Sequence, residues 1–386
     1  MNNFWEDLPR PFFVLAPMEA VTDVIFRHVV ARAGAPDIWF SEFTNATGWV
    51  HAGQKAIGGR LIKTDDEQPI VAQIWGGEPG DMEQLAAHCR ELGFHGIDIN
   101  MGCPAKSAIK SGGSALIRNP TLAAKEIAAA KSAGLPVSVK TRLGYTHIDE
   151  WREWLAHLLW QDIVNLTIHL RTKKEMSKVP AHFELIPEII ALRDEIAPGT
   201  LLTINGDVRD RAHGLELVRQ YPGIDGIMIG RGVFADPFCF AADTVSLTAA
   251  PPTISSESNV TDYVGNRVID SSERLASGSP SADSDRPAQS SEQSAARDSD
   301  TESRSEAVLS DLSGESADMR KAELINLLHY HLTLYDQYAP QTNRPFETLK
   351  RFFKIYIRDF DGAKELRDQL MHTKSTDEVR ALLETA

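Results

Sequence analysis

Eight short apolar runs recur before residue 231 of this chain, and their spacing is what most limits the fold. The runs lie at 12–16, 38–42, 70–75, 96–100, 137–140, 164–169, 201–205 and 226–230. Each has the length of a buried strand, and the intervals of roughly 25 to 40 residues leave room for a helix between strands. Helical spacing of apolar residues fills several intervals, at 82–92, 122–133 and 151–160. Eight such units predict an α/β protein with a (β/α)8 TIM barrel.

A doubly wound parallel sheet is the alternative fold for alternating strands and helices. The first run, however, leads into Ala-Pro-Met-Glu-Ala rather than into the GxGxxG turn of a dinucleotide-binding sheet. The barrel is therefore the preferred prediction.

A change of composition divides the chain into three predicted parts. Residues 251–318 are dominated by Ser, Asp, Glu, Ala and Arg, and such a segment cannot bury enough apolar surface to offset the entropy lost on ordering. Residues 251–320 carry 14 Asp and Glu against 6 Lys and Arg, more than half of the net charge of -14. We predict a barrel over 1–250, a disordered acidic insertion over 251–318 and a helical domain over 319–386. A partner-binding or phosphorylated segment is the alternative for the insertion.

The cysteine count and the N-terminus indicate the cellular setting. The three cysteines, Cys89, Cys103 and Cys239, are far apart and form no CxxC pair, which argues against a disulfide framework and a cysteine-rich zinc site. The N-terminus lacks the pattern of a signal peptide, and no apolar run reaches the ~20 residues that a bilayer requires. We expect a cytoplasmic, monomeric protein with no membrane association and no obligate protein partner.

Polar side chains follow nearly every predicted strand. Because a TIM barrel builds its active site from the carboxyl ends of its strands, these side chains are expected to converge on one ligand site. In strand order, the strand ends carry Pro17 and Met18, Glu42, Gln73, Asn100 with Cys103, Lys140 with Arg142, His169 with Arg171, Asn205 with Asp207, and Gly230 with Arg231.

Two of these strand ends are typical of a phosphate site, and three others suit a planar ring. The segments 205–207 and 230–232 follow strands seven and eight, the usual phosphate-binding corner of such barrels, where Arg231 could supply charge. Gln73, Asn100 and Lys140 offer donors, acceptors and a positive charge to a heterocycle. Together these features suggest flavin mononucleotide (FMN).

Cys103 lies in Asn-Met-Gly-Cys-Pro, where Gly102 and Pro104 disfavour regular structure just after a predicted inner strand. A thiol with a pKa near 8.5 keeps its proton at neutral pH, and reduction of an activated double bond needs one proton beside each hydride. We therefore predict that Cys103 is a general acid. The alternative is a buried, inert cysteine. No HExxH, CxxC or GxSxG motif occurs, so we predict neither a metal nor a Ser-His-Asp hydrolase.

A basic and aromatic segment lies in the C-terminal part. Arg344, Lys350, Arg351, Lys354 and Arg358 alternate with Phe and Tyr at helical spacing. The pattern predicts a helix with Phe352, Ile355 and Tyr356 toward a core. Its cations could form a solvated face or could contact a phosphate backbone.

Several motifs resemble those of one enzyme family, in order along the barrel. They are Ala-Pro-Met-Glu-Ala-Val-Thr-Asp-Val-Ile-Phe-Arg (16–27), Gln-Ile-Trp-Gly-Gly-Glu-Pro (73–79), Asp-Ile-Asn-Met-Gly-Cys-Pro-Ala-Lys (98–106), Ser-Val-Lys-Thr-Arg-Leu-Gly (138–144), Ile-His-Leu-Arg-Thr (168–172) and Asn-Gly-Asp-Val (205–208). The chain resembles the tRNA-dihydrouridine synthases, and its basic C-terminal segment is similar to their tRNA-binding domain.

The resemblance implies that NADPH reduces FMN, that hydride passes from FMN to C6 of a specific tRNA uridine, and that Cys103 protonates C5. Matching residues then imply contacts with the flavin ring and ribityl chain by Pro17, Met18, Gln73, Asn100, Lys140 and His169. Asn205, Asp207, Gly230 and Arg231 would lie on the phosphate side of FMN. Residues implied to contact tRNA are Asn100, Lys106, Arg142, Arg171, Arg344, Lys350, Arg351 and Lys354.

Two alternative functions remain from the sequence. An FMN-dependent barrel oxidoreductase that acts on a free small molecule, such as a dihydroorotate dehydrogenase or an ene-reductase, would explain the barrel and Cys103 but not the basic C-terminal segment. A non-catalytic RNA-binding protein on an inherited barrel would be expected to lack Cys103 or Lys140, and both are present.

Overall fold

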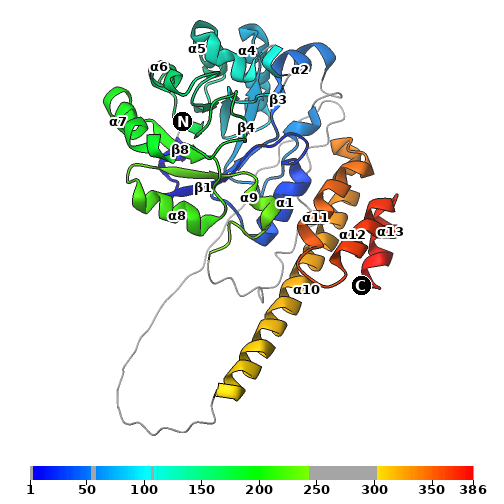
Figure 1. Ribbon diagram of the computed structural model, residues 1–386. Coiled ribbons are helices and arrows are strands. Elements are labelled where there is room, and N and C mark those ends of the chain that lie inside the picture. The colour runs from blue at the N-terminus through cyan, green and yellow to red at the C-terminus, as the bar shows by residue number, and fades with distance from the viewer. Residues whose placement is uncertain (1–2, 54–57, 106–107, 111, 243–301, 386) are drawn as a thin grey trace, which may run out of the picture. The chain divides into compact units, whose positions relative to one another are not determined.

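The computed structural model describes residues 3–53, 58–105, 108–110, 112–242 and 302–385, with the backbone alone for 58 and 302–317. Parallel strands form a nearly closed barrel that helices surround on the outside (Figure 1). The prediction of a TIM barrel followed by C-terminal helices is therefore confirmed.

The sheet is wholly parallel, as βαβ connections require. Its strands are β1 (Phe12–Leu15), β2 (Trp39–Phe40), β3 (Thr44–Asn45), β4 (Ile70–Trp75), β5 (Gly96–Asn100), β6 (Val137–Arg142), β7 (Asn165–His169), β8 (Leu201–Asn205) and β9 (Gly226–Ile229). The order is β1-β9-β8-β7-β6-β5-β4-β2, with β3 also paired to β4. A single parallel bridge between Val14 and Ile38 links the two ends of this order. The structure ends the second strand at Phe40, two residues before the predicted end at Glu42.

The helices of the barrel follow its strands. They are α1 (Val24–Ala33), α2 (Ala46–Ala52), α4 (Pro79–Glu91), α5 (Pro120–Lys131), α6 (Trp151–Leu159), α7 (Ile186–Ile196), α8 (Arg211–Gln220) and α9 (Gly232–Ala235). Asp23, Asn119 and Asp210 accept hydrogen bonds from the first-turn backbone of α1, α5 and α8. Short 3-10 turns lie at Phe4–Glu6, Gly58–Leu61, Ala108–Lys110, Gly113–Arg118, Ile148–Glu150 and Phe183–Leu185.

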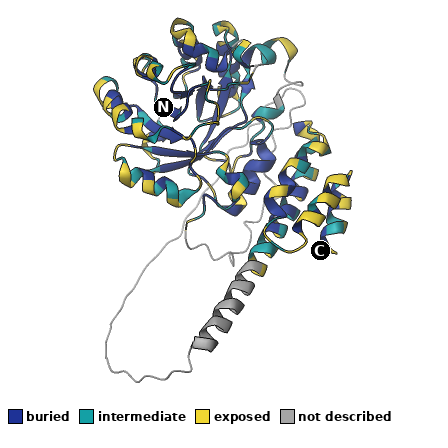
Figure 2. Cartoon of the chain, in the orientation of Figure 1, coloured by how far each residue is buried: buried dark blue, intermediate teal, exposed yellow. Residues whose placement is uncertain are grey.

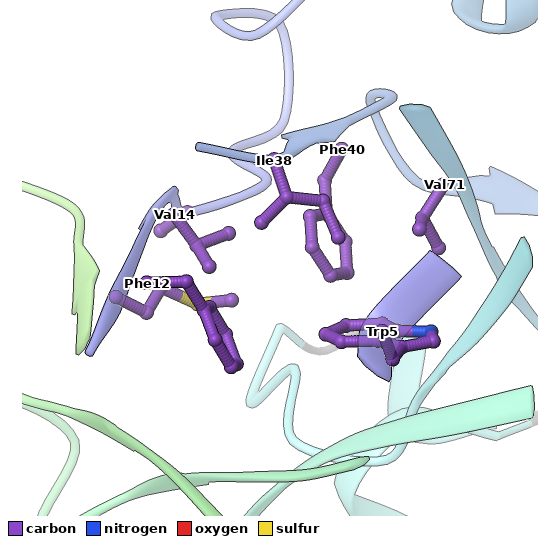
Figure 3. Packing of buried hydrophobic residues seen from close by; sticks show 8 residues of the cluster. Trp5, Phe12, Val14, Ile38, Phe40 and Val71 are labelled. Atoms are coloured by element: carbon purple, nitrogen blue, oxygen red, sulfur yellow. The ribbon is translucent and has the colours of Figure 1, made fainter. Parts of the chain in front are cut away.

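One apolar cluster fills part of the barrel interior (Figure 3). Trp5, from the N-terminal 3-10 turn, packs edge-on against the rings of Phe12 and Phe40, with centroids 5.7 and 6.5 Å away. Val14, Ile38 and Val71 complete the labelled cluster (Figure 3). The interior of the barrel is therefore a packed core, as in TIM barrels generally, and a functional site is expected at the ends of the strands.

The C-terminal helices are α10 (Glu302–Thr342), α11 (Phe353–Tyr356), α12 (Ala363–His372) and α13 (Thr376–Leu383). α10 begins inside the segment predicted to be disordered, in a stretch that contains the helix-favouring residues Glu, Ala and Leu. Residues 251–301 of that segment lie outside the described residues.

The basic segment is not the single helix that the sequence predicts. A 3-10 turn (Phe346–Phe352) leads into the one-turn helix α11. Leu349 and Phe352, three residues apart, are both buried, which matches the period of a 3-10 turn. Phe352, Ile355 and Tyr356 do face a core, as predicted.

The barrel and the helices from Lys321 onward belong to one compact unit. Phe26 of α1 packs against Phe352, with ring centroids 4.8 Å apart, and against Phe234 of α9. The apolar sides of these helices are accordingly buried and their outer sides exposed (Figure 2). Among the described residues, no helix combines the length and the apolar character needed to cross a membrane.

Candidate active site

Strand register brings five of the predicted site residues into one row. Asn100 of β5 lies opposite Lys140 of β6, Arg142 of β6 lies opposite His169 of β7, and His169 lies opposite Asn205 of β8. The carboxyl ends of four consecutive strands therefore carry an amide, an ammonium, a guanidinium, an imidazole and a second amide side by side.

A chain of hydrogen bonds connects the barrel interior to the Cys103 loop. Gln73 Nε2 donates to Asp98 Oδ2 at 2.7 Å, and Asn100 Nδ2 donates to Gln73 Oε1 at 3.1 Å. Asn100 Oδ1 in turn accepts from the backbone N–H groups of Gly102 and Cys103, at 3.0 and 2.9 Å. Asp98 thus determines which way the Gln73 amide faces, and Gln73 does the same for Asn100. The side chains of Gln73 and Asn100 are consequently held in fixed orientations.

Asp98 is a site residue that the sequence reasoning missed. Its side chain is fully buried, and it also accepts a hydrogen bond from Ser138 Oγ at 2.6 Å. Burial raises the pKa of Asp98 to about 6 despite these hydrogen bonds. Asp98 and Asn100 are two positions apart on β5, and period-two alternation could have placed both on the inner face.

Cys103 lies just beyond β5 on a loop that the backbone fixes. The Cys103 carbonyl accepts from Ser114 N at 3.1 Å, and Gly113, at φ +55°, approaches that carbonyl so closely that a Cβ there would lie 3.1 Å from it. The thiol is partly exposed. Burial raises its pKa, and the charge of Glu19 adds to this, while Lys140 and Arg142 act in the opposite direction. The thiol is therefore protonated at neutral pH.

Cations surround this site. Burial and the charge of Arg142 lower the pKa of Lys140 to about 8. Burial and the charges of Arg142, Lys140, Arg171 and Arg231 lower the pKa of His169 far below its ordinary value. His169 is therefore a neutral imidazole that can donate one hydrogen bond and accept another.

Two arginines that the sequence predicts to face RNA are bound within the barrel. Arg142 donates to the carbonyls of Gly102, Thr172 and Met176, at 2.9, 3.1 and 3.1 Å. Arg171 is 2% exposed, donates to the Val179 carbonyl at 2.6 Å and pairs with Asp207. Both arginines therefore hold the loops that follow β5, β7 and β8 together.

The predicted phosphate corner contains a carboxylate between two arginines. Asp207 pairs with Arg171 and, at 3.0 Å, with Arg231. Asn205 Nδ2 donates to the Met228 carbonyl at 2.8 Å. Apart from its chain neighbours, Gly230 has only the Ala16 methyl, among the described residues, within 4 Å of where its Cβ would be, which leaves room for a ligand.

The first strand end is bonded to the loop that follows it, and the second contacts the C-terminal part of the chain. Pro17 is buried, and Met18 is partly exposed with its N–H donating to Thr22 Oγ1 at 2.9 Å. Glu42 is fully buried, accepts from Ala20 N at 2.6 Å and pairs with Arg344. Arg344 therefore joins the C-terminal helices to the barrel.

The other predicted RNA-contacting residues differ in exposure. Arg351 and Lys354 are exposed, although Arg351 also donates to the Ala20 carbonyl at 3.1 Å. Lys350 is largely buried and pairs with Glu347 at 3.0 Å. Lys106 lies outside the described residues.

The residues present fit a flavin nucleotide. His169 Nδ1 and Arg171 Nη1 are buried without a hydrogen-bond partner in the part of the chain that the structure describes. Buried polar atoms rarely remain unsatisfied, so these two atoms indicate a ligand with polar groups. The neighbouring cations suit an anionic ligand. Among the described residues, no group of three or more His, Cys, Asp or Glu side chains is arranged to hold a metal ion.

The fold and site define a TIM-barrel enzyme with a protonated thiol among cations at the carboxyl ends of its strands. Residues 14–278 match the family model described as dihydrouridine synthase (Dus). The chain belongs to the dihydrouridine synthase family.

Curated relatives match over nearly their whole length. One, of Bacillus subtilis (strain 168), is named "Probable tRNA-dihydrouridine synthase 2" and is 50% identical over 99% of this chain and 96% of its own length. Another, of Staphylococcus epidermidis (strain ATCC 35984), is named "Probable tRNA-dihydrouridine synthase" and is 47% identical over 100% of this chain and 96% of its own.

Proposed function

We propose that this protein is a tRNA-dihydrouridine synthase that reduces the C5–C6 double bond of a specific uridine in tRNA, with FMN as cofactor and NADPH as reductant. The observation that carries this proposal is Cys103, a protonated and partly exposed thiol on a fixed loop beside Lys140. Membership of the family supports the reaction class. With tRNA as its substrate, the enzyme is expected to act in the cytoplasm.

Nine side chains and one glycine would hold FMN. Gln73, Asn100, Lys140 and His169, with Pro17 and Met18, would contact the ring and ribityl chain. Asn205, Asp207, Gly230 and Arg231 would lie toward the phosphate. When bound, FMN supplies the hydride, which it obtains from NADPH. The Asp98–Gln73–Asn100 hydrogen bonds would hold the two amides in place for the ring, and they fix the Cys103 backbone at the same time.

Cys103 would act as the acid. Its Sγ–H donates the proton to C5 of the uracil ring as C6 gains hydride, so that one hydride and one proton saturate the double bond. The thiolate left behind is stabilised by the charges of Lys140 and Arg142, both of which lower the pKa of Cys103. Because the thiol is partly exposed, water can return the proton for the next cycle.

The uridine must leave its base stack to reach a site at the mouth of a barrel. A separate domain that binds RNA by backbone and shape would support that extrusion, and we propose this role for the helical part, 319–386. Of the cations predicted to contact tRNA in this part, Arg351 and Lys354 are exposed. For Arg142, Arg171 and Arg344, which are bound within the protein, we propose that they position the loops that receive the RNA.

The same burial of arginines also favours the second candidate, an FMN barrel oxidoreductase for a free small molecule. The two functions differ in which oxidant turns over the reduced flavin. Anaerobic stopped-flow absorbance would compare unmodified tRNA with free uridine and orotate. We expect tRNA at micromolar concentration to reoxidise the flavin and the small molecules at millimolar concentration to be far slower. Fast reoxidation by a small molecule, with none by tRNA, would instead establish the second candidate.

A further inference from the structure

Two cations at the mouth of the barrel are held against one tyrosine ring. Arg118 Cζ lies 5.1 Å and Lys173 Nζ 4.8 Å from the centroid of Tyr145. Arg118 ends the 3-10 turn Gly113–Arg118, Tyr145 follows β6, and Lys173 follows β7. Because both charged groups lie near one centroid, they are at most about 10 Å apart, and each cation–π contact restrains a long, flexible side chain.

The turn that ends at Arg118 is attached to the Cys103 loop, and the loops that carry Tyr145 and Lys173 are attached to each other. Lys173 N donates to the Gly144 carbonyl at 2.8 Å, and Lys174 N donates to the Tyr145 carbonyl at 3.0 Å, so the loops after β6 and β7 run together. Ser114, in the turn that ends at Arg118, donates its N–H to the Cys103 carbonyl. The cation pair therefore has a fixed position relative to the catalytic thiol.

The charge of this pair is not neutralised within the described part of the chain. Neither Arg118 nor Lys173 forms an ion pair there, in contrast to Arg171 and Arg344. Of the two carboxylates that follow Tyr145 most closely, Asp149 is exposed, and Glu150 accepts hydrogen bonds from the backbone N–H groups of residues 145–147.

The surrounding loop adds to this positive charge. Lys174 and Lys178 are exposed and likewise have no ion pair among the described residues. Glu175, between them, is bound to the Thr172 N–H and to His182. The surface around Tyr145 is thus cationic in a chain whose net charge is -14.

We propose that Arg118 and Lys173, ordered by Tyr145, bind the sugar–phosphate backbone of tRNA beside the target uridine. This inference rests on the proposed function. It gives the barrel an RNA contact of its own, apart from the C-terminal helices. Holding both cations in place before binding lowers the entropy lost on binding, which is the purpose that the tyrosine serves. The phosphates of NADPH offer the same chemistry, so the test must separate the two sources.

The test measures equilibrium binding of an unmodified tRNA transcript to FMN-loaded protein over a series of salt concentrations. The variants are Arg118→Gln with Lys173→Gln together, Tyr145→Ala and Tyr145→Phe. Arg219→Gln is the matched control, because Arg219 is an exposed arginine in the last turn of α8, at the opposite end of the barrel. The rate of flavin reduction by NADPH is measured for each variant and confirms that it is folded.

We expect the double variant to bind tRNA roughly tenfold more weakly than the parent protein at 0.15 M salt. The magnitude of the slope of log K against log salt concentration should fall by about 1.5, because each lost phosphate contact removes about 0.7 to 0.9 from that slope. Tyr145→Ala should weaken binding by a smaller factor, whereas Tyr145→Phe, which keeps the ring, and Arg219→Gln should match the parent. The KM for NADPH should not change.

Two results would overturn the inference: an unchanged affinity and salt slope in the double variant, or a raised KM for NADPH with tRNA binding intact. Both results can be measured even if the parent protein makes no dihydrouridine, because the experiments follow only tRNA binding and flavin reduction. Failure of the proposed function would appear separately, as absence of product from the parent protein.

Discussion

Replacing Arg344 tests whether this residue joins the helices to the barrel or contacts RNA. Arg344 Nη2 donates to Glu42 Oε2, and its Nε lies 3.8 Å from Asp23 Oδ2. Glu42 is fully buried, while the Arg344 side chain is 18% exposed. In Arg344→Gln the Glu42 carboxylate would keep only Ala20 N at 2.6 Å and Arg60 Nε at 3.4 Å.

The expected magnitude follows from this geometry. Removing one partner of a buried ion pair costs about 3 to 5 kcal/mol. Because Glu42 keeps two partners and Arg344 is partly exposed, we expect Arg344→Gln to lower the free energy of unfolding by about 2 to 3 kcal/mol. Glu42→Gln should cost a similar amount, and the double variant should cost less than the sum, with a coupling energy of about 2 kcal/mol.

Urea unfolding followed by circular dichroism would measure all four members of this cycle. Arg351→Gln is the matched control, since Arg351 is exposed and makes one hydrogen bond to a carbonyl; its effect should be below about 1 kcal/mol. If Arg344→Gln left stability unchanged, showed no coupling to Glu42→Gln and only weakened tRNA binding, Arg344 would be an RNA ligand and the argument would be refuted.

Three further predictions concern buried charges. Burial and nearby carboxylates raise the pKa of Glu126 from 4.5 to about 7, so its ionisation lowers the stability of the protein as pH rises from about 4.5 to 7. The change in the free energy of unfolding caused by Glu126→Gln, measured by urea unfolding, should be about 2 to 3 kcal/mol more stabilising at pH 8 than at pH 4.5. Equal effects at both pH values would contradict this. Lys140, with a pKa lowered to about 8, should lose its charge above that pH, so kcat should fall there. Lys140→Arg should move this fall in kcat to higher pH. If the variant kept the pH profile of the parent protein, the fall would not come from Lys140. Asp98→Leu removes the acceptor that orients Gln73 and should weaken FMN binding by roughly 10- to 100-fold in fluorescence titration, while Asp98→Asn, which keeps an acceptor, should lose less.

The barrel and the row of site residues could be predicted because both follow from local pattern. Each strand is a short apolar run, and the polar residue after a strand must lie at the carboxyl end of a parallel sheet. Asn100, Lys140, His169 and Asn205 therefore come together as expected. The short β2 was less predictable, because only Trp39 and Phe40 pair with β4.

The partners of the arginines could not be predicted. Sequence gives the chemical type of Arg142, Arg171 and Arg344, but each has an acceptor far away in the chain, at 40, 36 and 302 residues respectively. An arginine beside a site can bind either a ligand or the protein, and only tertiary structure distinguishes the two. For the same reason, the contacts of Arg118 and Lys173 with Tyr145 could not be predicted, because two different loops bring these residues to the tyrosine.

The central claim is that Cys103 protonates a tRNA uridine. The most direct measurement incubates FMN-loaded protein and NADPH with bulk tRNA that lacks dihydrouridine, in parallel with Cys103→Ala, and quantifies dihydrouridine in the nuclease digest by mass spectrometry. The account predicts product from the parent protein and at least a hundredfold less from Cys103→Ala, the typical contribution of a general acid being about 10²- to 10⁴-fold. No product from the parent, while NADPH still reduces its flavin, would contradict the account, as would a Cys103→Ala variant as active as the parent.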